Sequence, residues 1–375
     1  GAGKHDRARD TSRQSLMLLS AAGIILTAVC MAFAEPIIRF AGAKDEILAP
    51  AVSYYRLIAA GFFFQSVTIS ITAALRGVGI TKIPMVYNLT AAAINVGLNY
   101  ILIYGKLGCP AMGIEGAALA TTLSKIAAFL AAVCIMFFAK TPVSVRKGDS
   151  FKPDLPILRR ILKIGITSGM EQVILQSGAV LSTKILAVIP TVDFAAYQIA
   201  ANVEGIAWQP GGACCTAATT CMGQALGEGR IDKAKAMTKM IYLTALCISA
   251  AVVLLFLFCA LPIAEIYTPD KAVALTSSRI MLYCAIAIPG VSTHQTIAGA
   301  LRGAGDTRTP MLASLCSLWI FRVALSFLLV RILNLGVIAM RICVTLDQLV
   351  RASINLIRYC RGKWAVKPAL SAEET

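Results

Sequence analysis

Two glutamates stand deep inside apolar segments of this sequence. Glu171 lies eleven positions into the segment 160–187, and Glu204 lies twelve positions into the segment 192–226. In helices these positions are roughly 16 and roughly 18 Å from opposite faces, hence at similar depth in a bilayer core about 30 Å thick. Two neighbouring carboxylates in a low dielectric repel each other, and a shared proton or bound cation would relieve them. We expect a coupling-cation or substrate-cation site there; two glutamates facing a watery cleft without a coupling role are the alternative.

A second group of polar side chains is neutral. Asn95 and Asn99 are four residues apart in the segment 84–104, so they share one helix face, and Thr121 in a later segment lies at a compatible depth. Their oxygens would suit a hard cation if a carboxylate stood nearby. Lys125, one turn after Thr121, would repel such a cation or substitute for it. Hydrogen bonds between helices are the competing interpretation.

Two further features concern charge at depth. Asp347 and Arg351 are spaced four residues apart, which predicts an ion pair on one helix. We expect that pair to be structural, neutralising both charges, rather than a gate. Arg322 stands in the middle of another apolar segment, and the sequence names no partner for it.

Composition shows which elements must position these residues. Of the 375 residues 58% are apolar and 14% charged, with a mean hydropathy of +0.75. Soluble domains have about 45–50% apolar and about 25% charged residues, so a disordered chain is excluded and a soluble enzyme is disfavoured. We expect an all-α polytopic membrane protein with ten transmembrane helices, at about 13–34, 51–75, 84–104, 113–139, 160–187, 192–226, 235–260, 272–300, 311–332 and 337–360.

The basic residues indicate topology. Loops assigned alternately to the two sides carry 22 Lys and Arg on one side and 5 on the other. The positive-inside rule places the first residues, the 140–159 loop and the last residues in the cytoplasm. We therefore expect a multi-pass protein of the plasma (inner) membrane, surrounded by lipid. The net charge of +16 needs no nucleic-acid partner to explain it.

The sequence repeats itself at an offset of 226 residues, without a gap over residues 1–85. The matches include Ala74-Leu75-Arg76-Gly77 with Ala300-Leu301-Arg302-Gly303, Gly79 with Gly305, Thr81 with Thr307, and Pro84-Met85 with Pro310-Met311. Six helices separate the copies, so they have parallel topology. The second copy has two more helices before it, so we expect two pseudo-symmetric six-helix lobes with the first lacking its first two helices. The expected domains are 1–139, the linker 140–159, the lobe 160–362 and the tail 363–375.

Several segments carry a family resemblance. GQALGEGRIDKA (223–234), LRGVGITKIPM (75–85), LRGAGDTRTPM (301–311), GIEGAALATTLS (113–124) and LDQLVRASINLIRYCRGKW (346–364) resemble the multidrug and toxic compound extrusion (MATE) transporters of prokaryotic type. The resemblance implies two lobes across a cleft and export of organic, often cationic, compounds against H⁺ or Na⁺. In one prokaryotic branch, positions matching Asn95, Asn99 and Thr121 join an aspartate on the first helix in a cation site. The position of Asn99 is commonly aspartate there.

Other classes of function have less support in the sequence. A membrane enzyme would need an acid, a base and a nucleophile or metal ligands near one interface, and no such motif appears; we expect no enzyme, no metal site and no cofactor beyond the coupling ion. A lipid-linked sugar flippase of the same superfamily is the alternative, for which Lys125 and Arg322 would hold a pyrophosphate. We expect a monomer.

Overall fold

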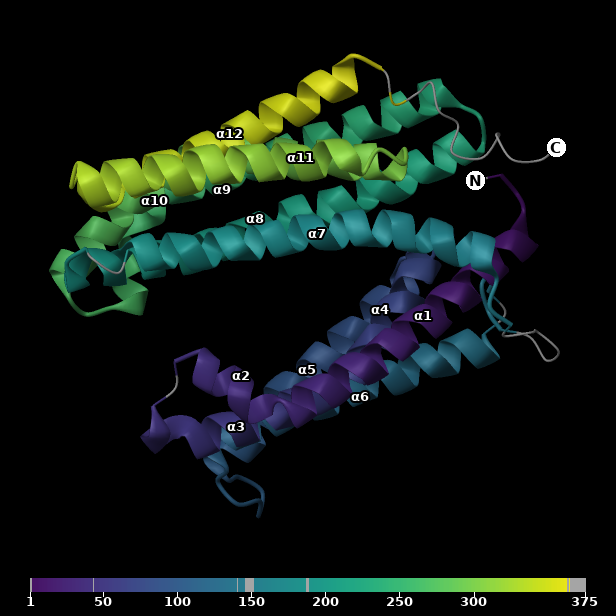
Figure 1. Cartoon of the computed structure of the whole chain (residues 1–375), viewed down its shortest axis with the longest axis horizontal. Helices are drawn as coiled ribbons and strands as arrows, with labels where there is room; N and C mark the ends of the chain where they lie inside the picture. The colour runs from purple at the N-terminus through teal and green to yellow at the C-terminus, as the bar shows by residue number, and fades with distance from the viewer. Residues whose placement is uncertain are drawn as a thin grey trace. The chain divides into compact units, whose positions relative to one another are not determined.

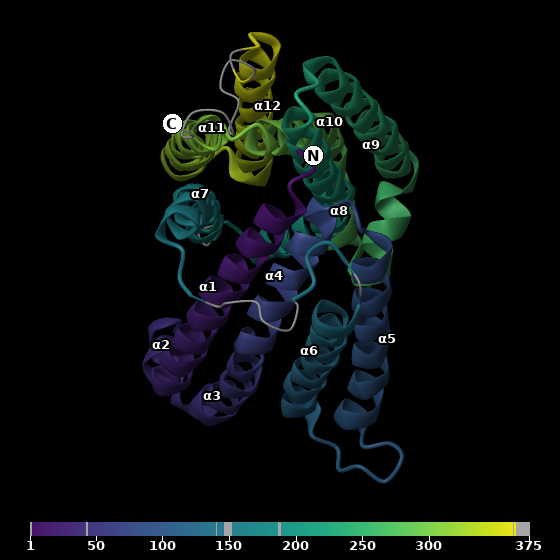
Figure 2. The same cartoon turned by 90° about the vertical axis from the view of Figure 1, so that its right-hand side faces the viewer.

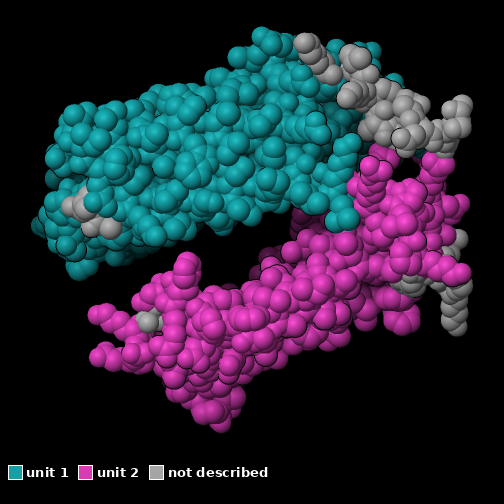
Figure 3. Space-filling model, viewed as in Figure 1, with its two compact units in different colours: residues 1–2, 162–375 teal, residues 3–161 magenta. Residues whose placement is uncertain are grey.

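The computed structural model describes residues 2–42, 44–139, 141–145, 152–186, 189–362 and 364. The chain forms two compact units, coloured separately in Figure 3: unit 2, residues 3–161, and unit 1, residues 1–2 with 162–375. The division falls inside one long helix. The centre of the expected linker, 146–151, and most of the expected tail lie outside the described residues.

Unit 2 is a bundle of helices. They are α1 (His5–Ala32), α2 (Ala34–Phe40), α3 (Asp45–Ala60), α4 (Phe62–Gly77), α5 (Lys82–Tyr104) and α6 (Gly113–Phe138). Helix α1 packs on α4, and α6 packs on α3, α4 and α5 (Figures 1 and 2). Val67, Ile71, Leu75 and Met136 form the apolar core between these helices.

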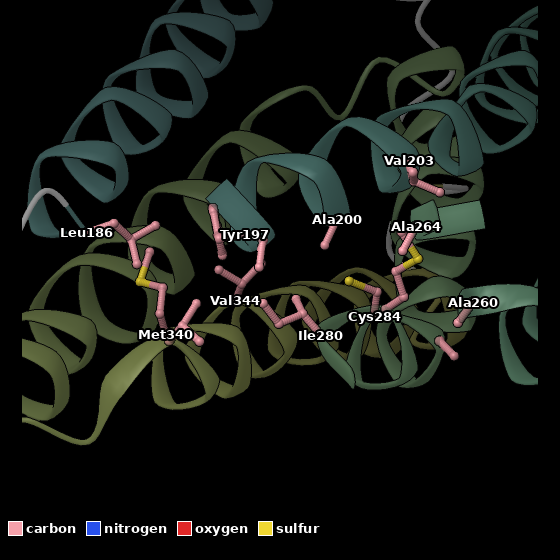
Figure 4. Close-up of a cluster of buried hydrophobic side chains, with 14 of the residues drawn as sticks. Leu186, Tyr197, Ala200, Val203, Ala260, Ala264, Ile280, Cys284, Met340 and Val344 are labelled. Atoms are coloured by element: carbon pink, nitrogen blue, oxygen red, sulfur yellow. The ribbon is translucent and has the colours of Figure 1, made fainter. Parts of the chain in front are cut away.

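Unit 1 contains the longer helices. They are α7 (Leu155–Leu186), α8 (Thr191–Gly227), α9 (Ile231–Tyr267), α10 (Lys271–Gly303), α11 (Arg308–Ser317), the π-helical segments η1 (Leu318–Leu325) and η2 (Phe327–Ile332), and α12 (Gly336–Cys360). Helix α10 is central, because it packs against α8, α9 and α12 (Figure 1). Figure 4 shows the largest apolar cluster, to which Tyr197, Ile280, Met340 and Val344 belong.

Glycines let α10 approach α8 closely. A Cβ at Gly299 would lie 2.3 Å from the carbonyl oxygen of Cys215, and one at Gly303 would lie 2.4 Å from that of Thr219. The Thr219 hydroxyl also donates to the Gly299 carbonyl at 2.9 Å. Small residues four apart thus bring two helix backbones together, as they do in membrane bundles.

The sequence repeat is present in the backbone. Helices begin at residues 5 and 231, 45 and 271, and 82 and 308, each pair 226 apart. The turn glycines Gly79 and Gly305 both have φ of 85°. Each donates its N–H at 2.9 Å to the carbonyl of the repeated arginine, Arg76 or Arg302. The two turns therefore share one conformation.

The helices confirm the all-helical class. Seven spans among the described residues are long and apolar enough to cross a membrane: His5–Ala32, Asp45–Gly77, Lys82–Tyr104, Gly113–Phe138, Ile231–Tyr267, Lys271–Gly303 and Arg308–Ile332. Helices α7, α8 and α12 are long enough but are not in that set. Their polar side chains lower the hydropathy, so ten spans stay a prediction.

Candidate functional site

The neutral polar residues of unit 2 meet between α5 and α6. Asn95 donates its Nδ2 to the hydroxyls of Thr121, at 3.5 Å, and Ser124, at 3.4 Å. Asn99 donates to the Asn95 Oδ1 at 3.1 Å. The structure thus brings together the three residues predicted from the sequence, and it adds Ser124. The bonds from Asn95 are long, so they hold the helices together weakly.

Lys125 lies beside this cluster and has an aromatic neighbour. Its Nζ is 5.6 Å from the centre of the Phe62 ring, within the range of a cation–π contact. A Cβ at Gly61, between α3 and α4, would lie 3.0 Å from the Lys125 Cδ, so glycine makes room for this chain. Within the described residues no carboxylate lies within 4 Å of the ammonium.

The buried carboxylates all belong to unit 1. Among the described residues the buried acids are Glu171, Glu204 and Asp347, which are 1%, 5% and 0% exposed. The acids of unit 2 that the structure describes are exposed or half-buried. A carboxylate in hydrocarbon is costly unless it is paired, so the partners of these three side chains decide what they can do.

Glu204 on α8 forms a two-pronged ion pair with Arg341 on α12. Arg341 donates Nη1 to Oε2 at 2.5 Å and Nη2 to Oε1. The arginine is 1% exposed, so both charges are enclosed. Such fork geometry is the strongest arrangement available to an arginine and a carboxylate. Arg341 was not among the site residues expected from the sequence, although a basic residue near the start of the last apolar segment was a signal for a buried partner.

Glu171 on α7 has a different partner, Arg302 at the end of α10. The Arg302 Nη2 donates to Oε2 at 2.7 Å, and the Ser314 hydroxyl donates to Oε1 at 3.1 Å. Arg302 also donates Nη1 to the Cys215 sulfur at 3.5 Å. The expected sharing of a proton or cation between Glu171 and Glu204 is therefore not the arrangement found, because a separate arginine neutralises each one.

The Asp347–Arg351 pair is confirmed. Arg351 Nη2 donates to both carboxylate oxygens of Asp347, at 2.7 and 2.8 Å. The Ser317 hydroxyl points at the same carboxylate at 2.7 Å, so the pair ties α12 to the end of α11. Nearby, the buried His294 ring nitrogen Nδ1 lies 2.8 Å from the Asn355 amide nitrogen.

Arg322, for which the sequence names no partner, contacts a hydroxyl. It stands in η1 and donates Nε to the Ser182 Oγ of α7 at 3.2 Å. Further along, Arg331 donates to the Lys184 carbonyl at 3.3 Å. Polar contacts of α10, α11 and η1 with Glu171 and Ser182 therefore hold α7 in unit 1.

The MatE family model matches residues 1–101 and 168–328 of this chain. These ranges hold the repeated turns, Asn95 and Asn99, and the buried Glu171 and Glu204. The chain belongs to the MATE family of transporters. It is a multi-pass membrane protein with the role of a transporter.

Individual MATE relatives agree with this assignment. The probable multidrug resistance protein NorM of Thermotoga maritima is 28% identical over 376 residues, covering 100% of this chain and 80% of that protein. The multidrug resistance protein PmpM of Pseudomonas aeruginosa is 28% identical, covering 85% of this chain and 67% of that protein.

Two solved transporter structures have a similar fold. A MOP superfamily transporter from Pyrococcus furiosus has a TM-score of 0.89 at 22% identity, over 98% of this chain and 81% of that one. The eukaryotic MATE transporter AtDTX14 has a TM-score of 0.87 at 14% identity, over 98% and 82%. At such identities the likeness concerns the fold alone.

Proposed function

We propose that the protein is a secondary active exporter in the plasma membrane. It moves organic compounds, often cationic, out of the cell in exchange for H⁺ or Na⁺, by alternating access between its two halves. The names of the relatives NorM and PmpM, both multidrug resistance proteins, support this substrate class. Both ends of the chain lie in the cytoplasm in this proposal, as the distribution of basic residues indicates.

The buried Glu204–Arg341 pair is the observation that carries the proposal. An ion pair with both charges enclosed can be opened by neutralising the acid, because the arginine is then left without a counter-charge. A proton on Glu204, or a Na⁺ that competes with Arg341 for its oxygens, would thus change which helix contacts are stable. Such linkage between ion binding and helix packing is what an antiporter requires.

Glu171 offers a second acid of the same kind. It connects α7 to α10 and α11 through Arg302 and Ser314, so neutralising it would loosen α7 from the unit. In unit 2, Asn95, Asn99 and Thr121 supply neutral oxygens for a substrate or cation. In this proposal unit 1 contains the protonatable groups and unit 2 contains the neutral ligands.

Vesicle transport of a fluorescent cationic dye tests the proposal. The purified protein is reconstituted, and a pH or Na⁺ gradient is imposed and then collapsed with an ionophore. We expect dye movement that requires one of the gradients and that Glu204→Gln removes. Glu265→Gln is the matched control, because Glu265 is exposed at the end of α9. Dye movement by the wild type that ignores both gradients would contradict the proposal.

A lipid-linked sugar flippase is the second candidate, and one observation favours it. Lys125 and Arg322 have no carboxylate within 4 Å in the described part of the chain, so each is a cation that could contact a phosphate group. Translocation of a fluorescent lipid-linked sugar in the same vesicles separates the two functions. Dye export without lipid movement supports the exporter, and the reverse supports the flippase.

A further inference from the structure

Within the described residues, one partly buried cation of unit 1 has no counter-charge beside it. Each buried carboxylate has its own arginine, and the half-buried Arg358 and Lys233 pair with Asp306 and Glu228. In the described residues from 162 on, Arg322 is the basic side chain that is at least half-buried and yet has no carboxylate within 4 Å. It is a surplus cation among apolar helices, where a charge normally faces a partner or a cavity.

The contact with α7 orients Arg322 without consuming its fork. Its Nε donates to the Ser182 oxygen, and the Ser182 hydroxyl itself donates to the Gly178 carbonyl at 2.7 Å. Neither Nη atom has a hydrogen-bond partner among the described residues, and neither is among the fully enclosed unpartnered atoms. A guanidinium held at Nε with both Nη atoms accessible presents two parallel donors, the geometry that recognises a carboxylate.

The surroundings suit an anion with an apolar body. Tyr197 on α8 lies within electrostatic range of Arg322, and its hydroxyl donates to no described residue. Figure 4 shows Tyr197 within the apolar cluster that includes Leu186 and Val344. Phe327 follows Arg322 by five residues, the hydrogen-bond spacing of a π-helix, and is 51% exposed. The other guanidinium nearby, Arg341, is already committed to Glu204.

We propose that Arg322 binds the carboxylate group of amphipathic organic substrates. The exported class then includes zwitterionic and anionic carboxylates as well as cations. This inference rests on the proposed export function and specifies its substrates. It assigns to Ser182 the task of holding the guanidinium in place, so Ser182 is a positioning residue.

A matched pair of dyes provides the test. A rhodamine with a free carboxylate and its methyl ester share a fluorophore and differ in this group alone. Binding of each dye to the purified protein is measured by fluorescence polarisation. Transport of each dye is measured in vesicles that contain the protein. We expect Arg322→Gln to weaken binding of the acid by about tenfold or more, the worth of a charge-assisted pair of hydrogen bonds. Binding of the ester should stay within about twofold.

Two variants control for structure. Arg331→Gln removes a guanidinium that contacts the same helix nine residues further along, and we expect it to treat both dyes as the wild type does. Arg322→Lys keeps the charge without the fork, and we expect an intermediate loss for the acid alone. Thermal unfolding of each purified variant checks that it is folded. If Arg322→Gln does not fold, Arg322→Lys is used as the test variant in its place.

The outcomes separate this inference from the export function. Equal effects of Arg322→Gln on both dyes, or no effect on either, would overturn the carboxylate assignment while export stands. A loss that appears in vesicles with anionic lipid and vanishes without it would assign Arg322 to a lipid phosphate and also overturn the inference. Failure of the wild type to move either dye would contradict export, and the binding measurement would still decide the role of Arg322.

Discussion

The two copies of the repeat share a backbone plan and differ in how they treat polar groups. In the first copy, residues 5–104, the helix pairs α1–α2 and α3–α4 are each interrupted, at Phe33 and Gly61. In the second, residues 231–332, the corresponding helices α9 and α10 run on without interruption. The repeated arginines also differ, because Arg302 pairs with Glu171 while no carboxylate lies within 4 Å of Arg76 in the described residues.

This difference shows that one fold accommodates two kinds of polar interior. Unit 2 relies on amides and hydroxyls, which hydrogen-bond to one another and can accept a weakly held ligand. Unit 1 relies on enclosed ion pairs, which are stable together and costly to separate. Binding of a coupling H⁺ or Na⁺ would need an acidic group, and in the described chain the buried acids are in unit 1. The two units can therefore perform different tasks without a difference in architecture.

The largest effect is expected from breaking an ion pair of unit 1. Arg341→Met leaves the Glu204 carboxylate enclosed without a partner, so we expect the free energy of unfolding to fall by about 3–5 kcal/mol. Lys125→Met in unit 2 leaves no buried carboxylate without a partner, so it should change the free energy of unfolding by less than about 1 kcal/mol. Thermal unfolding of the purified variants measures both. The double variant Glu204→Gln with Arg341→Met should recover most of the loss, and a double variant as unstable as Arg341→Met alone would show that the pair is not the cause.

The close contact of α8 and α10 gives the next effect. Gly299→Ala places a Cβ 2.3 Å from a backbone oxygen, and we expect overpacking to cost about 1–3 kcal/mol. The equivalent residue of the first copy is already alanine, Ala73, and it is exposed. Ala73→Gly should therefore cost no more than the roughly 1 kcal/mol of helix propensity. Equal unfolding temperatures for Gly299→Ala and the wild type would argue against the contact.

The repeated turns should respond equally. Gly79 and Gly305 both have a φ of 85°, where a Cβ is strained, so alanine at either position should cost about 1–2 kcal/mol. The two losses are measured separately by thermal unfolding, each against the wild type. A loss at one turn alone would mean that the copies do not share this conformation in solution.

The smallest effect concerns the partly exposed Glu228–Lys233 pair at the turn from α8 to α9. A hydrogen bond from Lys233 lowers the pKa of the Glu228 carboxyl below its ordinary 4.5. The pKa of Glu228 is lower in the folded protein than in the unfolded chain. The pair therefore stabilises the folded protein at pH values above the unfolded-state pKa, and this stabilisation is lost as the pH falls through the folded-state pKa. Unfolding temperatures of wild type and Glu228→Gln should differ slightly near pH 7 and converge in acid. A difference in unfolding temperature that grows as the pH falls would contradict this prediction.

Features within one helix or one repeat could be predicted from the sequence. The i,i+4 spacing predicted the Asp347–Arg351 pair, and helical periodicity placed Asn95 and Asn99 on one face, at a depth compatible with Thr121. The offset of 226 residues predicted the shared turns, because identical residues at glycine-dependent positions impose identical backbone angles. Such features depend on local geometry alone.

Contacts between distant helices could not be predicted. Glu204 and Arg341 are 137 residues apart, and nothing in either segment specifies that they face each other. In the sequence Arg302 belongs to the repeated turn segment, and nothing there indicates that its side chain pairs with Glu171. The depth of a residue along a helix follows from counting residues. The direction of its side chain around the helix follows from packing. Packing therefore decides whether two acids share an ion or each pair with a separate arginine.

Ion movement during substrate transport tests the central claim most directly. Vesicles with trapped pH and Na⁺ indicators receive a substrate gradient, and the counter-movement of each ion is recorded for the wild type, Glu204→Gln and Asn95→Ala. We predict that substrate entry drives H⁺ or Na⁺ in the opposite direction, that Glu204→Gln abolishes this ion movement, and that Asn95→Ala changes the substrate concentration needed while keeping the ion movement. Substrate flux with no ion movement in the wild type, or ion movement unchanged in Glu204→Gln, would contradict the claim that the paired acids of unit 1 couple transport to an ion.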